Sequence, residues 1–258
     1  MAHDYEYFKR EILALTTIDL NAYKENQMKR RIDTLISKRK IVGYEKYVAA
    51  IRADKALFEE FITHITINVS EFYRNPEQWK MLEDTVIPDL VKKFGRNIKV
   101  WSAACSTGDE PYSLVMAFSR HLPLNQIRIL ATDLDKQVIA KAKTGLYTEK
   151  SIAAVPADLK KKFFVKVGPS YKISDEIKAR VDFKEHNLLK DTYPTDYHLI
   201  VCRNVLIYFT EEAKAEVFRK FQKVLVKKGI LFIGNTEQII TYKEMGYDRL
   251  SSFYYVKL

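Results

Sequence analysis

The residues best suited to chemistry lie between Ile98 and Ser113, where an apolar run passes into small residues and then into two acids and a proline. This order predicts a strand, a tight turn and a helix. Small side chains let the turn backbone approach a ligand closely, and a helix N-terminus offers unpaired N–H groups to a carboxylate or phosphate. The stretch therefore predicts a site for a nucleotide-like cofactor.

Two common cofactor motifs are absent from this stretch. Gly108 is its only glycine, so the Gly-x-Gly-x-x-Gly pattern of dinucleotide-binding proteins is missing, and no Gly-Lys-Ser/Thr ending marks a P-loop. NAD and ATP are therefore poor candidates.

An acid follows at the end of the next apolar run, where Asp133 lies 25 residues beyond Gly108 (133 − 108). Related folds hold a ribose hydroxyl pair at the tip of the second strand. Alternatively, Asp133 caps a helix expected over 136–144, and the residues alone leave both readings open. Turn and acid together favour an adenosine-bearing ligand. S-adenosylmethionine fits, because its carboxylate suits the helix start and its sulfonium suits a carboxylate such as Glu110.

Length and composition indicate a globular protein. The chain has 258 residues, 47% hydrophobic and 29% charged, which suffices for one large core or for a medium and a small domain. It contains no apolar run of about 18 residues, and charges interrupt its first 20 residues, so we expect neither a membrane span nor a signal peptide. We expect a cytoplasmic monomer.

The only cysteines, Cys105 and Cys202, give no metal-ligand spacing and no disulfide framework, so we expect no metal. Cys105 lies in the ligand turn without a histidine nearby in sequence, which favours a small residue fitted against the ligand over a nucleophile. The net charge of +10 indicates an acidic partner, either nucleic acid, an anionic membrane or an acidic protein surface.

The first 75 residues show apolar spacings of three to four, which predict a small all-helical domain (1–75) before a second domain (76–258). A helix expected over 23–40 is strongly basic. Lys24, Arg31 and Lys38 are seven residues apart and line one edge of its apolar stripe. They form either a solvated flank or a docking strip for an acidic helix or polyanion.

Polar and apolar residues alternate between Thr66 and Pro76, with Asn68, Ser70 and Arg74 among the polar ones. This pattern suits a linker with its own turn hydrogen bonds. It equally suits a segment that crosses the cofactor pocket and supplies polar contacts.

Strands and helices alternate through the rest of the chain, which predicts an α/β fold with a mostly parallel, Rossmann-like sheet. The last two strands can place one antiparallel strand in it. A basic insert at about 145–180 is expected to form a helix and short antiparallel strands. Residues 136–190 contain 13 Lys and Arg against 6 Asp and Glu, which suits either a partner or solubility. The expected strands span 98–102, 127–133, 181–185, 198–202, 229–234 and 252–257, and the longer helices 76–94 and 211–227.

Five blocks together resemble the bacterial chemotaxis receptor methyltransferases, and in particular Bacillus-type members. They are residues 68–74, 103–113, 131–133, 187–189 and 202–209, in the family's order. The resemblance implies an enzyme that uses S-adenosylmethionine to methylate glutamate side chains on the cytoplasmic helices of chemoreceptors, with S-adenosylhomocysteine as product. The sequence departs from the family pattern at four positions, where Thr, Phe, Gly and Glu are common in the family and this chain has Ser70, Tyr73, Ala104 and Asp109.

The resemblance also implies residue roles. Arg74 and Tyr208 would face the reacting carboxylate as catalytic residues. Cofactor contacts would come from Asn68, Ser70, Arg74, Glu110, Asp133, Asn187, Leu188, Arg203 and Asn204.

The implied chemistry requires no general base, because a glutamate with a pKa of about 4.3 is already ionised. Positioning and removal of water would supply the catalysis. Arg74 can hold one carboxylate oxygen while the other attacks, and Tyr208 can orient the group.

Two alternatives remain as tests of this interpretation. A nucleic-acid methyltransferase usually carries a polar-Pro-Pro-aromatic clamp or an attacking cysteine, and this chain has Arg203-Asn204-Val205 after the corresponding strand. We therefore expect no nucleic-acid partner. A non-catalytic adaptor is disfavoured because four residues are intact: Arg74, Glu110, Asp133 and Tyr208.

Overall fold

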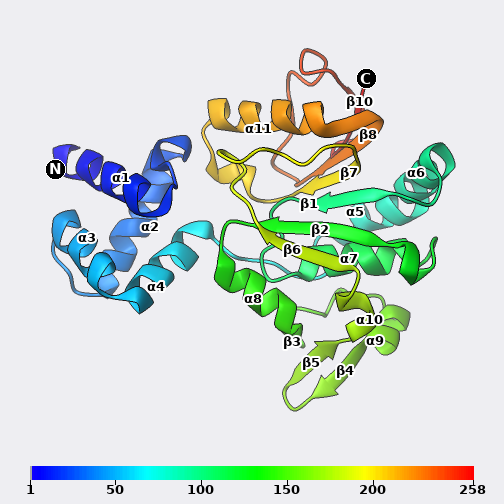
Figure 1. Ribbon diagram of the computed structural model, residues 1–258, viewed down its shortest axis with the longest axis horizontal. Coiled ribbons are helices and arrows are strands. Elements are labelled where there is room, and N and C mark those ends of the chain that lie inside the picture. Colours follow the sequence, from blue (N-terminus) through cyan, green and yellow to red (C-terminus); the bar gives the residue numbers. More distant parts are fainter. Residues whose placement is uncertain (1) are drawn as a thin grey trace. The chain divides into compact units, whose positions relative to one another are not determined.

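The computed structural model describes residues 2–258 (Figure 1). They divide into two compact units, which we call the helical unit (residues up to 68, with 205–216) and the sheet unit (69–204, with 217–258). The ranges expected from sequence, 1–75 and 76–258, differ from these units chiefly by the segment 205–216. Among the described residues no helix is both long and apolar enough to cross a bilayer.

The helical unit is built on aromatic packing. Phe8 meets Phe61 edge-on, with ring centroids 6.0 Å apart, and Tyr47 packs against both. The segment 205–216 joins this unit through backbone bonds: Lys24 N donates to Tyr208 O at 2.9 Å. Its elements are α1 (Ala2–Thr16), η1 (Leu20–Ala22), α2 (Glu25–Lys38), α3 (Tyr44–Ala53), α4 (Lys55–Thr66) and η4 (Leu206–Tyr208).

The sheet unit contains a seven-stranded sheet in the order β6-β2-β1-β7-β8-β10-β9. From β6 to β8 all neighbours are parallel, whereas β10 runs antiparallel to both β8 and β9. The predicted mostly parallel sheet is confirmed, and the antiparallel strand in it is β10, near the C-terminus of the chain. The strands are β1 (Lys99–Ser102), β2 (Arg128–Asp133), β6 (Val181–Glu185), β7 (Tyr197–Cys202), β8 (Leu225–Ile233), β9 (Tyr247–Arg249) and β10 (Tyr254–Lys257).

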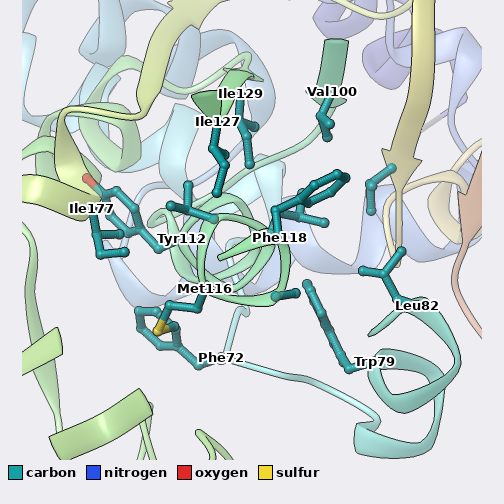
Figure 2. Close-up of a cluster of buried hydrophobic side chains, with 14 of the residues drawn as sticks. Phe72, Trp79, Leu82, Val100, Tyr112, Met116, Phe118, Ile127, Ile129 and Ile177 are labelled. Carbon is teal, nitrogen blue, oxygen red and sulfur yellow. The ribbon is translucent and has the colours of Figure 1, made fainter. Parts of the chain in front are cut away.

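Helices of this unit pack around the sheet, and every residue of α7 is buried. Figure 2 shows Tyr112, Met116 and Phe118 leaving α7 in different directions among residues from the neighbouring strands and helices. Burying α7 on all sides fixes its N-terminus beside the turn after β1. The helices are α5 (Pro76–Met81), η2 (Leu82–Val86), α6 (Ile87–Phe94), α7 (Asp109–Phe118), η3 (Leu124–Gln126) and α8 (Lys136–Thr144). Helix α11 (Glu211–Val224) belongs to this unit from Val217 onward.

The insert forms a second, three-stranded antiparallel sheet in the order β3-β5-β4, as expected. Figure 1 shows it grouped with two short helices at the bottom of the view. Its elements are β3 (Leu146–Thr148), α9 (Ala157–Phe163), β4 (Phe164–Val167), β5 (Ser170–Ile173) and α10 (Asp175–Lys178).

One helix expected from sequence has the expected ends but an irregular interior, and another ends earlier than expected. The helix expected over 76–94 contains the π-helical turn η2, because Pro88 has no N–H for the Asp84 carbonyl and Ile87 N bonds instead to Leu82 O. The helix expected to reach Lys227 ends at Val224. Strand β8 starts at the next residue, and a bulge in its pairing with β7 absorbs the two exposed lysines before Gly229.

Candidate cofactor site

The site lies where parallel strands end. Because β2, β1, β7 and β8 are neighbours and run in the same direction, the segments that follow them meet at one edge of the sheet. These segments carry the turn after Ser102, Asp133, Arg203 with Asn204, and Gly234. Ligands of open α/β sheets bind at this edge.

Asp133 holds the turn after β1. Its Oδ2 accepts a hydrogen bond from Ser106 N at 2.8 Å, and its Oδ1 accepts one from Asp135 N at 3.1 Å. Asp135 caps α8 by accepting from Gln137 N at 2.8 Å, so the helix-cap alternative for Asp133 was wrong. Burial raises the pKa of Asp133 to about 6, although the two backbone N–H groups act in the opposite direction.

Glu110 is a second buried carboxylate, in the first turn of α7. Its Oε1 accepts a hydrogen bond from Ser102 Oγ at 2.8 Å, and its Oε2 lies 3.7 Å from a guanidinium nitrogen of Arg203. Burial raises the pKa of Glu110 to about 6, and Arg203 limits that rise. The site therefore holds two carboxylates whose negative charge is only partly compensated.

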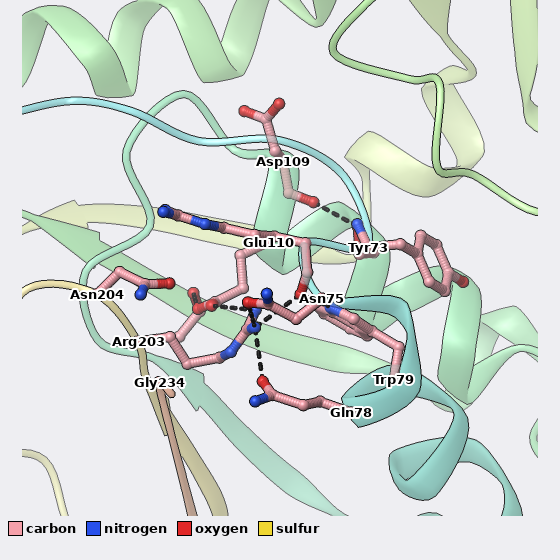
Figure 3. A network of polar contacts seen from close by, with 12 residues as sticks. Tyr73, Asn75, Gln78, Trp79, Asp109, Glu110, Arg203, Asn204 and Gly234 are labelled. Carbon is pink, nitrogen blue, oxygen red and sulfur yellow. Dashed lines mark hydrogen bonds and ion pairs between the residues drawn. The ribbon is translucent and has the colours of Figure 1, made fainter. Parts of the chain in front are cut away.

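Arg203 lies at the centre of a polar network (Figure 3). One terminal nitrogen donates to Arg74 O at 2.7 Å, Asn75 Oδ1 at 3.1 Å and Gln78 Oε1 at 2.8 Å. Its guanidinium carbon lies 4.8 Å from the ring centroid of Phe232. Arg203 is thus a buried cation that ties the end of β7 to the segment before α5.

The segment before α5 is shaped by polar contacts rather than by a linker's turns alone. Trp79 Nε1 donates to Arg74 O at 3.0 Å, and Tyr73 N donates to Ser113 Oγ at 3.1 Å. The Ser70 side chain is hydrogen-bonded to buried Asp109, the first residue of α7. The Arg74 guanidinium is half-buried and bonds to Val69 O at 3.3 Å.

Strained backbone concentrates in these segments. Tyr73, Asn75, Ser106 and Asn204 have φ values of 50°, 63°, 46° and 61°, in the left-handed region that non-glycine residues seldom adopt. Such conformations cost of order 1–3 kcal/mol each and persist where the surroundings impose them, commonly at ligand sites. The strain supports a functional role for this edge of the sheet.

The loop after β6 reaches the same edge, since β6 pairs with β2. Asn187 Oδ1 accepts a hydrogen bond from Leu189 N at 2.9 Å, and buried Leu188 accepts one from Tyr193 Oη at 2.7 Å through its carbonyl. Both residues named by the resemblance therefore lie in a loop that is held by its own hydrogen bonds. Their contact with a cofactor stays a prediction.

Asn68 and Tyr208 belong to the helical unit, as do the three basic residues of the expected docking strip. Asn68 Nδ2 donates to Thr66 Oγ1 at 2.9 Å. The roles expected for Asn68 and Tyr208 stay predictions.

The three basic residues differ in environment. Lys24 precedes α2 as its N-cap. Arg31 is half-buried, and a guanidinium nitrogen donates to His64 O at 2.6 Å; burial lowers the pKa of Arg31. Lys38 is 70% exposed, with Nζ 3.5 Å from Glu60 Oε1. Of the three, Lys38 is the best placed to meet a partner.

Two buried polar residues of the network were missed from sequence. Gln78 lies in α5 and accepts from Arg203, and Glu237 follows β8 with no exposed surface. Glu237 lies in the polar run Asn-Thr-Glu-Gln, which is typical of a solvated turn, so the only usable signal was its place after a buried strand.

These residues fit S-adenosylmethionine. A buried carboxylate at the tip of the second strand suits a ribose diol, and two undercompensated carboxylates favour a ligand that brings positive charge. Asp133 would hold the ribose, and Glu110 would face the positively charged part of the ligand. When bound, this cofactor supplies a methyl group activated by its sulfonium.

Cofactor binding should depend on pH. Glu110 and Asp133 both have a pKa raised to about 6, so both are mostly ionised at pH 7.5 and increasingly protonated below pH 6. Protonation removes the charge that attracts the cation, so we expect the affinity for S-adenosylmethionine to fall about tenfold from pH 7.5 to pH 5. Calorimetric titration across this range checks it. An affinity independent of pH would contradict the assignment.

Comparison with known proteins gives matches over nearly the whole chain. The family model "CheR methyltransferase, SAM binding domain" matches residues 68–252, and "CheR methyltransferase, all-alpha domain" matches residues 3–66. Proteins named "Chemotaxis protein methyltransferase" from Listeria innocua and Listeria monocytogenes are each 41% identical over 254 residues, covering 98% of this chain and 97% of theirs. "Chemotaxis protein methyltransferase 1" of Pseudomonas aeruginosa is 30% identical over 248 residues, covering 92% and 90%.

Proposed function

Since the chain belongs to the CheR family of S-adenosylmethionine-dependent methyltransferases of chemotaxis, we propose that its acceptors are glutamate side chains of chemoreceptors. The products would be glutamate methyl esters and S-adenosylhomocysteine. The observation that carries the proposal is the state of Arg74. Its backbone carbonyl is held by Arg203 and Trp79, while the residue stays partly exposed and its charge acts on the buried carboxylate of Glu110.

The proposed reaction requires the protein to position the two reactants, and it requires no proton transfer. One glutamate oxygen attacks the methyl carbon as the bond from that carbon to sulfur breaks, and no proton moves because the acceptor is already ionised. A half-exposed guanidinium such as Arg74 can bind the second oxygen and align the group. Tyr208 would orient the same carboxylate.

The proposed acceptors are cytoplasmic receptor helices rich in acidic residues, which places the enzyme in the cytoplasm. The net charge of +10 supports an acidic protein partner. Neither nucleic acid nor insertion into a membrane forms part of this proposal, and we propose that the enzyme acts as a monomer.

Docking on α2 is best tested at Lys38, because Arg31 is engaged with the His64 carbonyl and a charge reversal there would disturb the helical unit itself. We expect Lys38→Glu to lower kcat/KM for a receptor fragment about threefold at low ionic strength. The difference should vanish at high salt, since the contact is exposed. Steady-state assays at two salt concentrations measure it.

The matched control is Lys55→Glu, another exposed lysine of the helical unit, at the start of α4. It carries the same change of charge away from α2 and should leave methylation unchanged. Affinity for S-adenosylhomocysteine should be equal in all three proteins. If Lys38→Glu and Lys55→Glu lower kcat/KM equally, the effect comes from the net charge of the protein and not from docking on α2.

The test of the function is transfer of labelled methyl from S-adenosylmethionine to a purified chemoreceptor cytoplasmic fragment, followed by treatment with base. A base-labile label that maps to glutamate supports a carboxyl methyltransferase, because esters hydrolyse in base. A base-stable label means a nitrogen or carbon acceptor. Cofactor binding without any transfer means an adaptor or another substrate.

A further inference from the structure

Another buried carboxylate of the sheet unit has no part in the proposed reaction. Glu237 follows β8 and is fully buried. A single oxygen, Oε2, accepts hydrogen bonds from Asn204 N at 2.7 Å and from Gly234 N at 2.8 Å. Hydrogen bonds to a charged acceptor are about twice as strong as neutral ones. The side chain therefore joins the ends of β7 and β8, which pair as neighbours up to Cys202 and Ile233.

The backbone around this carboxylate is unusually tight. A Cβ added to Gly234 would lie 2.4 Å from Glu237 Oε2 and 2.9 Å from Asn204 N, so only glycine fits there. Asn204 adopts a left-handed conformation with a φ of 61°. Asparagine accepts this region better than most residues, but a positive φ still needs surroundings that impose it.

The charge of Glu237 acts on the same network. It raises the pKa of Glu110 and opposes the lowering of the pKa of Arg203. One buried guanidinium thus lies in the field of two carboxylates. Of the two, Glu110 faces the proposed cofactor site, whereas Glu237 is committed to backbone N–H groups.

We propose that Glu237 is a positioning residue that fixes Asn204 in its left-handed conformation and so presents the Asn204 side chain to the cofactor. Glu237 touches neither cofactor nor substrate and acts through the two strand ends that it joins. This inference rests on the proposed function, in which Asn204 contacts S-adenosylmethionine.

The experiment compares Glu237→Gln, Glu237→Asp and Glu237→Ala in the full chain. Glutamine keeps an acceptor oxygen at the same reach, whereas aspartate keeps the charge but is shorter by one methylene. We expect alanine and aspartate to weaken S-adenosylhomocysteine binding about 10- to 100-fold, because both variants lose the hydrogen bonds that the Glu237 carboxylate accepts. The KM for S-adenosylmethionine should rise in parallel, with the KM for receptor unchanged. Glutamine should restore binding to within about threefold of wild type.

A second measurement follows the conformation of Asn204 in the ligand-free protein. With ¹⁵N-asparagine labelling, the Asn204 amide resonance of the ligand-free protein should move in the alanine and aspartate variants and return near its wild-type position in the glutamine variant. Asp158→Asn, which removes an exposed carboxylate on α9, is the matched control for charge and should change neither readout.

The outcomes separate the two proposals. Unchanged affinity in folded alanine and aspartate variants overturns the role of Glu237. So does weaker binding with an unmoved Asn204 resonance, which means a general structural role. If alanine does not fold, the aspartate and glutamine variants decide by the same criteria. A wild-type protein that fails to bind S-adenosylhomocysteine refutes the proposed function. The resonances of the ligand-free protein would still test whether Glu237 fixes the conformation of Asn204.

Discussion

Replacing Arg203 by methionine is expected to lower the free energy of unfolding of the sheet unit by about 3–5 kcal/mol at pH 7.5, the cost of removing one partner of a buried ion pair. Methionine fills similar space but removes the donor to Asn75 Oδ1 and Gln78 Oε1, and it leaves Arg74 O with only the bond from Trp79 Nε1. It also leaves the Glu110 charge uncompensated. Urea unfolding followed by tryptophan fluorescence measures the change.

The pH dependence separates these two contributions. Burial already raises the pKa of Glu110 to about 6 in the folded protein, so the native state binds more protons than the unfolded state and stability falls as pH rises from about 4.5 to 6. Without Arg203 that pKa rises further, and the fall continues to higher pH. The deficit of the variant should therefore be larger at pH 7.5 than at pH 5.5.

Glu110→Gln supplies the double-mutant cycle. In the glutamine background the Glu110 charge is gone, so Arg203→Met should cost less and its cost should depend less on pH, with the Glu237 carboxylate still coupled to Arg203. A deficit equal at both pH values in the Glu110 background would show that the lost hydrogen bonds, not the ion pair, dominate the effect of Arg203.

Much of the sheet unit was predictable because its signals are local. Buried parallel strands are short apolar runs, and the small residues after Trp101 with the acids at 109 and 110 mark a strand, turn and helix in any context. The insert was also predicted, because Gly-Pro and Val-Pro pairs mark its turns. Strand β9 was missed, since its three residues Tyr247–Arg249 carry no alternation and pair only because β10 lies beside them.

The candidate site was predictable only where a residue's place on its own element sets its role. Asp133 at a strand tip and Glu110 at a helix start are such residues, and both lie at the expected edge. Gln78 and Glu237 meet Arg203 and Asn204 over separations of 125 and 33 residues. Contacts between distant segments depend on the packing of the whole unit, and spacing does not encode them.

The three basic residues of the expected docking strip also show what sequence spacing cannot predict. A seven-residue spacing placed Lys24, Arg31 and Lys38 on one line, and that spacing fixes direction but not environment. Arg31 is bonded to the last turn of α4 through the His64 carbonyl, whereas the Lys38 side chain is 70% exposed. A helical wheel cannot distinguish a guanidinium that anchors a neighbouring helix from one that awaits a partner.

Conservative replacement of Arg74 should have the largest effect on catalysis. Arg74→Lys keeps the charge but loses the planar fork that can grip a carboxylate through two parallel bonds. We expect kcat for receptor methylation to fall about 100-fold, the typical cost of misplacing a reacting group by about 1 Å. Affinity for S-adenosylhomocysteine should change less than tenfold, because Glu110 and Asp133 remain in place.

The structure explains why the loss should fall on kcat rather than on folding. Arg203 and Trp79 hold Arg74 through its backbone carbonyl, which the substitution keeps, and the guanidinium donates to Val69 O at 3.3 Å. Arg96→Lys, an exposed arginine of the same unit, controls for the replacement itself. If kcat survives in Arg74→Lys while cofactor affinity collapses, Arg74 serves the cofactor alone and another residue must orient the acceptor.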